Sequence, residues 1–131
     1  EAGVLKAVGR KGGKQLAEYQ LSTAGDPVSI NVSIKASRPH DGGLIYVYAE
    51  LKDKNGNIVY NAENEITCEI SGNLKILGME DANPRNIEDY KDNRQHAYHG
   101  KLLIYLQETG SPGNSGIKLS SPGLKSASIE F

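Results

Sequence analysis

The sequence is poor in the residues that carry covalent and metal chemistry. It holds a single cysteine, Cys68, one methionine, one phenylalanine and no tryptophan. One thiol cannot form a disulfide within the chain and cannot supply a cysteine-rich zinc site. The lack of tryptophan and of a second cysteine also excludes the Cys and Trp signature of antibody domains.

Long hydrophobic runs and an excess of one charge are missing as well. No apolar stretch approaches the roughly 20 residues of a membrane-spanning helix, and no signal-peptide pattern opens the chain. The 15 basic side chains nearly balance the 16 acidic ones, which argues against a nucleic-acid partner and against a polybasic membrane-surface segment. We therefore expect no nucleic-acid binding and no membrane insertion. The start at Glu1, without methionine, leads us to expect a fragment or a processed chain.

What the sequence does hold is turn chemistry between short β-type runs. Fifteen glycines and five prolines, with many Asn and Ser, separate segments rich in Ile, Val and Tyr. Residues 28–34 alternate apolar and polar side chains, as a half-buried strand does. Residues 44–51 carry bulk on both faces, which is typical of a central strand. Further strands are expected at 66–70, 74–77, 102–106, 117–119 and 127–131.

These segments predict an all-β fold, an immunoglobulin-like antiparallel β-sandwich of about seven strands from Val28 onward. A β-hairpin precedes the sandwich, because Gly12-Gly13 separates two strand-like runs. Asn55-Gly56 marks a second hairpin turn, from which residues 58–60 are expected to return. Residues 78–100 form the one long irregular stretch.

Two groups suggest metal binding, but a simpler interpretation is favoured for each. Asp53, Asn55 and Asn57 alternate as calcium ligands do, yet the Gly and Glu that an EF-hand loop needs are missing, so a plain turn is the better interpretation. His96 and His99 lie near several carboxylates and could bind zinc. They approach a strand, however, in which residues three apart point to opposite faces.

For the paired carboxylates and the single thiol, too, a structural role is favoured over a chemical one. Glu80-Asp81 and Glu88-Asp89 offer paired acids such as glycosidases use, but nothing in the sequence supplies a pocket to raise the pKa of one of them. Cys68 alternates with apolar residues and is expected in the core. We predict no catalytic residue, no metal site and no cofactor in this chain.

Tyrosine is the most frequent aromatic residue, with seven in the sequence. Tyr46 and Tyr48 share one strand face, while Tyr90 and Tyr98 bracket the long loop. Exposed rings can stack on sugars or anchor a protein interface. The alternative is that tyrosine covers the second face of a sheet and keeps its hydroxyl in water.

Several short motifs stand in order along the chain. They are Ile-Tyr-Val-Tyr-Ala-Glu-Leu-Lys-Asp-Lys-Asn-Gly-Asn at 45–57, followed by 61–64, 66–70, 77–78, 94–107, 116–119 and 123–127. Together they resemble the C-terminal immunoglobulin-like domain of glycoside hydrolase family 2 enzymes, the β-galactosidase group. One departure occurs at 81–84, where this chain reads Asp-Ala-Asn-Pro and the family commonly reads Asn-Gly-Asp-Pro.

The resemblance implies two parts. Residues 1–24, with Leu-Lys-Ala-Val-Gly at 5–9, are similar to the hairpin that closes the preceding domain in those enzymes. Residues 25–131 form the immunoglobulin-like β-sandwich domain.

The resemblance also implies a function without an active site of its own. The family's catalytic carboxylates belong to a separate TIM-barrel domain, so we expect a non-catalytic accessory domain that packs on other domains of a parent β-galactosidase-like enzyme. A carbohydrate-binding module that holds an oligosaccharide through surface tyrosines is the alternative. Bacterial export, to the periplasm or beyond, is expected for such a parent. The candidate interaction surface comprises Tyr46, Tyr48, Asn83, Tyr90, Arg94, His96 and Tyr98.

Overall fold

Ten strands make up the computed structural model, which describes residues 2–34, 43–110 and 114–130. These residues include no helix, and none is therefore long and apolar enough to cross a membrane. The predicted all-β class is confirmed. The strands are β1 (Val4–Lys11), β2 (Lys14–Ser22), β3 (Ser29–Ile34), β4 (Leu44–Lys52), β5 (Glu65–Ser71), β6 (Leu74–Glu80), β7 (Arg94–His96), β8 (Lys101–Glu108), β9 (Gly116–Ser120) and β10 (Ala127–Glu130).

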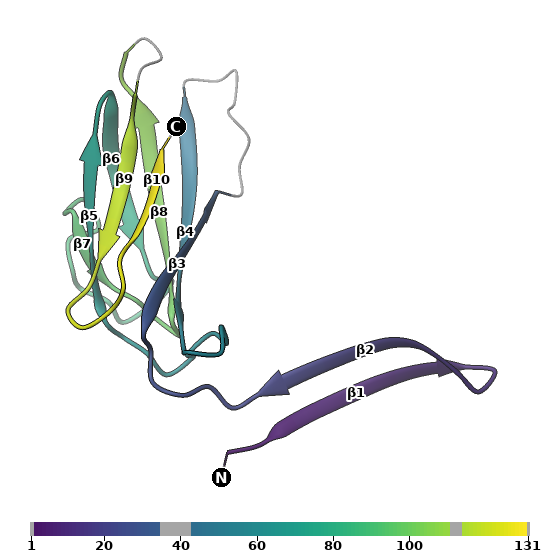
Figure 1. Cartoon of the computed structure of the whole chain (residues 1–131). Coiled ribbons are helices and arrows are strands. Elements are labelled where there is room, and N and C mark those ends of the chain that lie inside the picture. Colours follow the sequence, from purple (N-terminus) through teal and green to yellow (C-terminus); the bar gives the residue numbers. More distant parts are fainter. Residues whose placement is uncertain (1, 35–42, 111–113, 131) are drawn as a thin grey trace.

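The first two strands form a hairpin with a sheet of its own. Gly12 and Gly13 have φ angles of 57° and 78°, and positive φ at both central residues is what a type I′ turn requires. The predicted hairpin is thus confirmed. Leu5 stands opposite Leu21, with Tyr19 on the same face, so one face of the ribbon is apolar. Figure 1 shows the hairpin extending away from the other strands.

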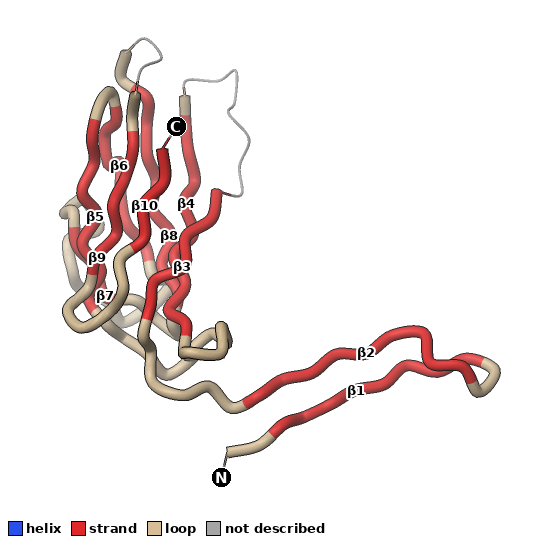
Figure 2. Tube along the Cα trace, in the orientation of Figure 1, coloured by secondary structure: helices blue, strands red, loops and turns tan. Residues whose placement is uncertain are grey.

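The remaining eight strands form a sandwich of two antiparallel sheets, with the orders β3-β4-β8-β6 and β10-β9-β5-β7. Figures 1 and 2 show the two sheets face to face. The start of β3 also joins the second sheet, because the Ile30 amide donates to the Lys125 carbonyl at 3.0 Å and the Lys125 amide to the Val28 carbonyl at 2.9 Å. This arrangement confirms the predicted immunoglobulin-like sandwich.

The core lies between the two sheets and follows the period-2 pattern of the sequence. Along β4, Val47 and Leu51 are fully buried and their neighbours in the chain are half-buried, as a central strand with one inward face requires. From the opposite sheet, Ile66 and Cys68 face the same core, and Cys68 is 1% exposed. The predicted burial of Cys68 is confirmed. Ile70 is 39% exposed, and the other two residues at the end of β5 are exposed as well.

Two local expectations need correction. Residues 78–100 are not wholly irregular, since β6 continues to Glu80 and β7 pairs with β5. A strand of three residues is too short to show an alternation in the sequence. The expected return strand at 58–60 shrinks to one bridge between Ile58 and Lys52, because the chain then leaves this sheet for β5 in the other. Phe131, expected in the last strand, lies outside the described residues.

Candidate functional site

A groove of about 780 Å³ runs along β6, one of the two edge strands of its sheet. The segment 81–93, which follows β6, folds back beside it and supplies much of the groove wall. This volume lies within the range of roughly 300–1,000 Å³ that is usual for small-molecule sites. The apolar and aromatic lining consists of Leu44, Leu77, Met79, Ala82, Pro84, Tyr90 and Tyr105.

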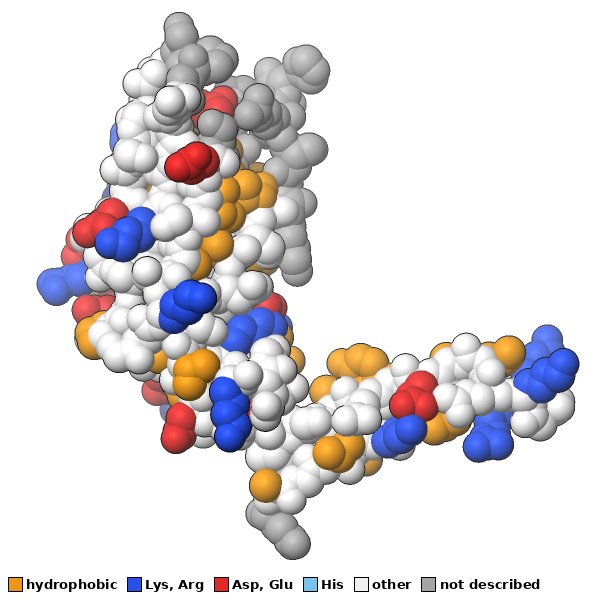
Figure 3. All heavy atoms as spheres, viewed as in Figure 1, with side chains coloured by type: hydrophobic (Ala, Val, Ile, Leu, Met, Phe, Trp, Pro, Cys, Tyr) orange, Lys and Arg blue, Asp and Glu red, His pale blue; other side chains and the backbone are white. Residues whose placement is uncertain are grey.

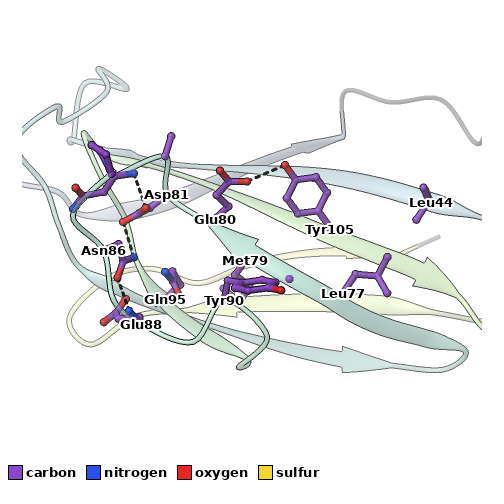
Figure 4. A pocket seen from close by; sticks show the side chains of 14 residues that line it. Leu44, Leu77, Met79, Glu80, Asp81, Asn86, Glu88, Tyr90, Gln95 and Tyr105 are labelled. Carbon is purple, nitrogen blue, oxygen red and sulfur yellow. Dashed lines mark hydrogen bonds between the residues drawn. The ribbon is translucent and has the colours of Figure 1, made fainter.

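Tyr90 forms one wall of the groove and is held against β6 at two points. A Cβ atom on Gly78 would come within 3.1 Å of the Tyr90 ring, so glycine is what permits this close approach. The Met79 amide donates to the Tyr90 carbonyl at 2.7 Å. Figure 4 shows the Tyr90 ring lying beside Met79. The same bond covers part of the open edge of β6, which would otherwise be free to pair with another strand.

Tyr105 lies on β8 and forms part of the opposite wall. Its hydroxyl donates to the Glu80 carboxylate at 3.2 Å, as Figure 4 shows. The Tyr46 ring meets it edge-on, with ring centres 5.5 Å apart. Burial and the nearby Glu80 raise the pKa of Tyr105, so the phenol stays protonated and neutral. The wall therefore offers an aromatic face beside a carboxylate.

Side-chain caps on backbone amides give the loop after β6 its shape. The Asp81 carboxylate accepts a hydrogen bond from the Asn83 amide at 2.7 Å and another from the Asn86 side chain at 3.0 Å. The Asn86 side-chain oxygen in turn accepts from the Glu88 amide at 2.8 Å. Asx turns of this kind are a regular use of Asn and Asp in loops. Figure 4 shows the side chains of Asp81, Asn86 and Glu88 in a row.

Glu88 ties this loop to β7. One oxygen of its carboxylate accepts the His96 backbone amide at 3.0 Å, and the other pairs with Nδ1 of the His96 ring. Partial burial raises the pKa of Glu88, but the hydrogen bonds from the His96 backbone and ring outweigh that effect and hold it below the ordinary value. An ionised Glu88 cannot serve as a general acid at neutral pH.

Gln95 contributes a polar group to an otherwise apolar part of the groove. Its side chain, in the middle of β7, is 3% exposed and lines the groove. Its Oε1 atom is buried and has no hydrogen-bond partner among the described residues. Buried carbonyl oxygens without a partner are rare in native structures, because losing water without replacement is costly.

The structure brings some of the predicted surface residues together and separates others. Asn83 and Tyr90 line the main groove. Asn83, His96 and Tyr98 line a smaller hollow of about 300 Å³ on the other side of the same loop. Arg94 stands apart, with its side chain in solvent and its Nε 3.5 Å from Asp92.

Tyr46 and Tyr48 occupy alternate positions on β4, on the face that points away from the core. Tyr46 does not line the groove itself but packs on Tyr105, which does. Tyr105 was not among the residues predicted from the sequence. Alternation along β8 was the signal that could have identified Tyr105, because it shares the outward face with Leu103. No sequence signal marks Gln95, since its burial depends on pairing between β7 and β5.

The histidines do not form a joint site. His96 pairs with Glu88, whereas Nδ1 of His99 lies 3.1 Å from the Tyr60 carbonyl oxygen. Within residues 2–34, 43–110 and 114–130, no group of three or more His, Cys, Asp or Glu side chains is placed to hold a metal ion.

The predicted turn at Asn55-Gly56 is confirmed, with a φ of 83° at Gly56. The Asp53 carboxylate accepts hydrogen bonds from three backbone amides: those of Asn55 at 2.9 Å, Asn57 at 2.8 Å and Gly25 at 3.0 Å. Its oxygens are thus occupied by the protein itself, and they join the turn to the segment that follows the hairpin.

Fold and groove together define the class of this molecule, an immunoglobulin-like β-sandwich domain. The chain belongs to the family described as glycoside hydrolase family 2 C-terminal domain 5, whose model matches residues 28–130. The family resemblance found in the sequence is confirmed.

Curated proteins of similar sequence agree with membership of this family. The chain is 33% identical over 133 residues to the β-galactosidase BoGH2A of Bacteroides ovatus, which covers 100% of this chain and 16% of the relative. A putative β-glucuronidase of Formosa agariphila is 28% identical over 121 residues, covering 89% of this chain and 12% of the relative. The chain thus spans about one-sixth or less of the length of these curated relatives.

Solved structures show the same fold at full coverage. A β-glycosidase from Bacteroides vulgatus superposes with a TM-score of 0.90 at 25% identity, covering 100% of this chain and 17% of that one. A glycosyl hydrolase family 2 member from Bacteroides cellulosilyticus superposes with a TM-score of 0.89 at 28% identity, covering 100% and 18%. The hairpin is included in both matches, because all of this chain is covered.

Proposed function

We propose that this chain is a non-catalytic accessory domain of a β-galactosidase-like family 2 glycoside hydrolase and that it packs on other domains of that enzyme. Family membership supports the kind of parent, and the relatives' names supply the activity. The observation that carries the docking role is the β1–β2 hairpin.

The hairpin has the surface of an element that belongs to an interface. Leu5 and Tyr19, on its apolar face, are 71% and 67% exposed. Figure 3 shows hydrophobic side chains along the hairpin, away from the sandwich. A two-stranded ribbon is at best marginally stable alone in water, and exposed apolar clusters are typical of contact surfaces. Packing on a neighbouring domain would bury this face and stabilise the ribbon.

The charged groups beside the groove support a non-catalytic role. Glycosidases need one carboxylic acid that is protonated at working pH, yet the pKa of Glu88 is lowered. Asp81 is engaged by Asn83 and Asn86. Glu88 is therefore ionised at neutral pH and is not prepared to donate a proton to a leaving group.

Two measurements test the docking role. The gene upstream of the Glu1 codon should continue in frame into a TIM-barrel coding sequence. Amide exchange should then be slower in residues 4–22 of the whole enzyme than in the same residues of the 131-residue chain. Equal exchange in both proteins would refute docking through the hairpin, and a stop codon upstream would refute the accessory role.

We further propose that the parent enzyme is exported to the periplasm or the exterior of a bacterium. The single buried thiol is compatible with an oxidising compartment, because it offers no exposed partner for unwanted disulfides. Fractionation of the source cells checks this proposal. Activity found only in the cytoplasm would contradict it.

A further inference from the structure

We propose that the groove beside β6 binds a neutral oligosaccharide. The proposal goes beyond docking, because no residue of β1 or β2 lines the groove. Three features of the groove point to this ligand class: its aromatic walls, the unpartnered amide of Gln95, and the sign of its charges.

The aromatic walls suit the shape of a sugar ring. Tyr90 is 57% exposed and Tyr105 faces the same groove. Sugars present C–H faces that pack on aromatic rings, while their hydroxyls point outward at the ring edge. Leu77, which is half-buried on β6, extends the apolar lining. A ligand with both apolar faces and polar edges matches this mixture better than a hydrocarbon does.

The buried side-chain amide of Gln95 lacks a hydrogen-bond partner, and a ligand hydroxyl could provide one. Its Oε1 atom is unpaired although the residue is 97% removed from solvent. The torsion that turns a glutamine amide is broad and roughly two-fold, so the amide can present its oxygen or its nitrogen to the groove. A sugar hydroxyl both donates and accepts, and satisfies either end.

The charges of the groove disfavour an acidic ligand. Glu80, Asp81 and Glu88 line the groove, and its lining, all within the described part of the chain, contains no Lys or Arg. One cation, Lys91, stands 5.7 Å from the Tyr90 ring centre but does not line the groove. A uronic acid would meet like charge, whereas carboxylates are good acceptors for neutral hydroxyls.

Titration calorimetry on the 131-residue chain tests the ligand class. The probes are neutral tetrasaccharides of galactose, glucose, mannose and xylose, with tetragalacturonate as the charged counterpart. We expect saturable heat with at least one neutral probe, at a Kd of about 1 mM or tighter, and none with tetragalacturonate. Absence of heat with all four neutral probes overturns the proposal, as does equal binding of tetragalacturonate.

Variants test the location. Tyr90→Ala should weaken binding about threefold to tenfold, as the loss of one stacking ring predicts. Tyr60→Ala is the matched control, because Tyr60 is 54% exposed and lies outside the groove, and it should leave the Kd unchanged. Equal effects of the two variants would show that the groove is not the site.

Gln95→Leu separates a binding role from a structural one. Removing an unpaired buried amide should keep or raise the Tm, while the Kd rises severalfold. An unchanged Kd would overturn the role of Gln95. If this variant does not fold, Tyr90→Ala alone decides. The docking role stays independent, because removal of the hairpin should leave the heat of binding intact.

Discussion

At the scale of single residues, Ala82 sits in a backbone conformation that suits glycine. Its φ is 63°, in the left-handed region that costs an L-residue roughly 1–2 kcal/mol. The hydrogen bond from the Asn83 amide to Asp81 holds the turn in this shape. The glycoside hydrolase family 2 motif commonly has glycine at this position, so alanine at position 82 has a cost in backbone strain.

We expect Ala82→Gly to raise the free energy of unfolding by about 0.5–1 kcal/mol, because the relief of strain exceeds the entropy that glycine adds to the unfolded chain. Urea denaturation measures the change. Ala82→Val is the control and should be destabilising, since a β-branched side chain tolerates positive φ poorly. A loss of stability with glycine would contradict the assignment of strain.

Asp53 is a buried carboxylate whose charge is held by several hydrogen bonds. The Gly25 amide above all, then Asn57 and Asn55, lower the pKa of Asp53 to about 2 although burial opposes this. In the unfolded chain an aspartate ionises near 3.9. The stabilisation from its carboxylate is therefore complete above about pH 4 and disappears as the pH falls towards 2.

Asp53→Ala should consequently unfold at a lower temperature at pH 7 and should lose less stability than the wild type between pH 4 and 2. Thermal unfolding followed by circular dichroism at several pH values measures both effects. Asp26→Ala is the control, because Asp26 is exposed in the neighbouring linker. Parallel curves for wild type and Asp53→Ala would refute the role of this carboxylate.

At the scale of elements, the hairpin and the sandwich form separate sheets within this chain. The hairpin sheet contains only β1 and β2, and its backbone bonds run between its own strands and flanks. Figure 2 shows one loop segment joining it to β3. Stability of the sandwich should therefore not depend on the hairpin.

Deletion of residues 2–22 should shift the Tm of the remaining chain by no more than about 2 °C. Leu51→Ala is the contrasting variant, since it empties a fully buried site and should cost about 2–5 kcal/mol. Differential scanning calorimetry compares the two. A deletion as damaging as Leu51→Ala would mean that the hairpin supports the sandwich.

The register of β5 can be checked through its thiol. Cys68 pairs with Leu119 of β9 and faces the core, and burial, with a smaller contribution from Glu69, raises the pKa of Cys68 to about 12. A thiol reagent at pH 8 should react slowly with the native chain and quickly in denaturant. Fast labelling of the native chain would indicate a one-residue slip, which turns this face outward.

At the scale of the whole molecule, the proposed accessory role predicts that this chain cleaves no glycoside by itself. We expect the 131-residue chain to release no nitrophenol from nitrophenyl β-galactoside or β-glucuronide. Spectrophotometry at pH 5 and pH 7 measures the release, with a commercial β-galactosidase as the positive control. Turnover that disappears in Glu80→Gln or Glu88→Gln would refute the non-catalytic role.

Much of this molecule was determined by the sequence alone. The alternation at 28–34 and 66–70 and the Gly12-Gly13 and Asn55-Gly56 turns predicted strands, turns and the burial of Cys68. These features depend on neighbours two to four residues apart, so local physics suffices. The order of the short motifs along the chain indicated the family, because a sequence resemblance can be read without the fold.

Only the tertiary structure decided where the groove lies. Gln95 is buried because β7 pairs with β5, some 30 residues earlier in the chain. Tyr90 is held by Gly78 and Met79, and Tyr105 of β8 meets Glu80 of the neighbouring strand β6. Such contacts join residues that no short pattern connects. Strand pairing and the packing of a loop against a sheet edge create them, and the sequence shows neither until the chain has folded.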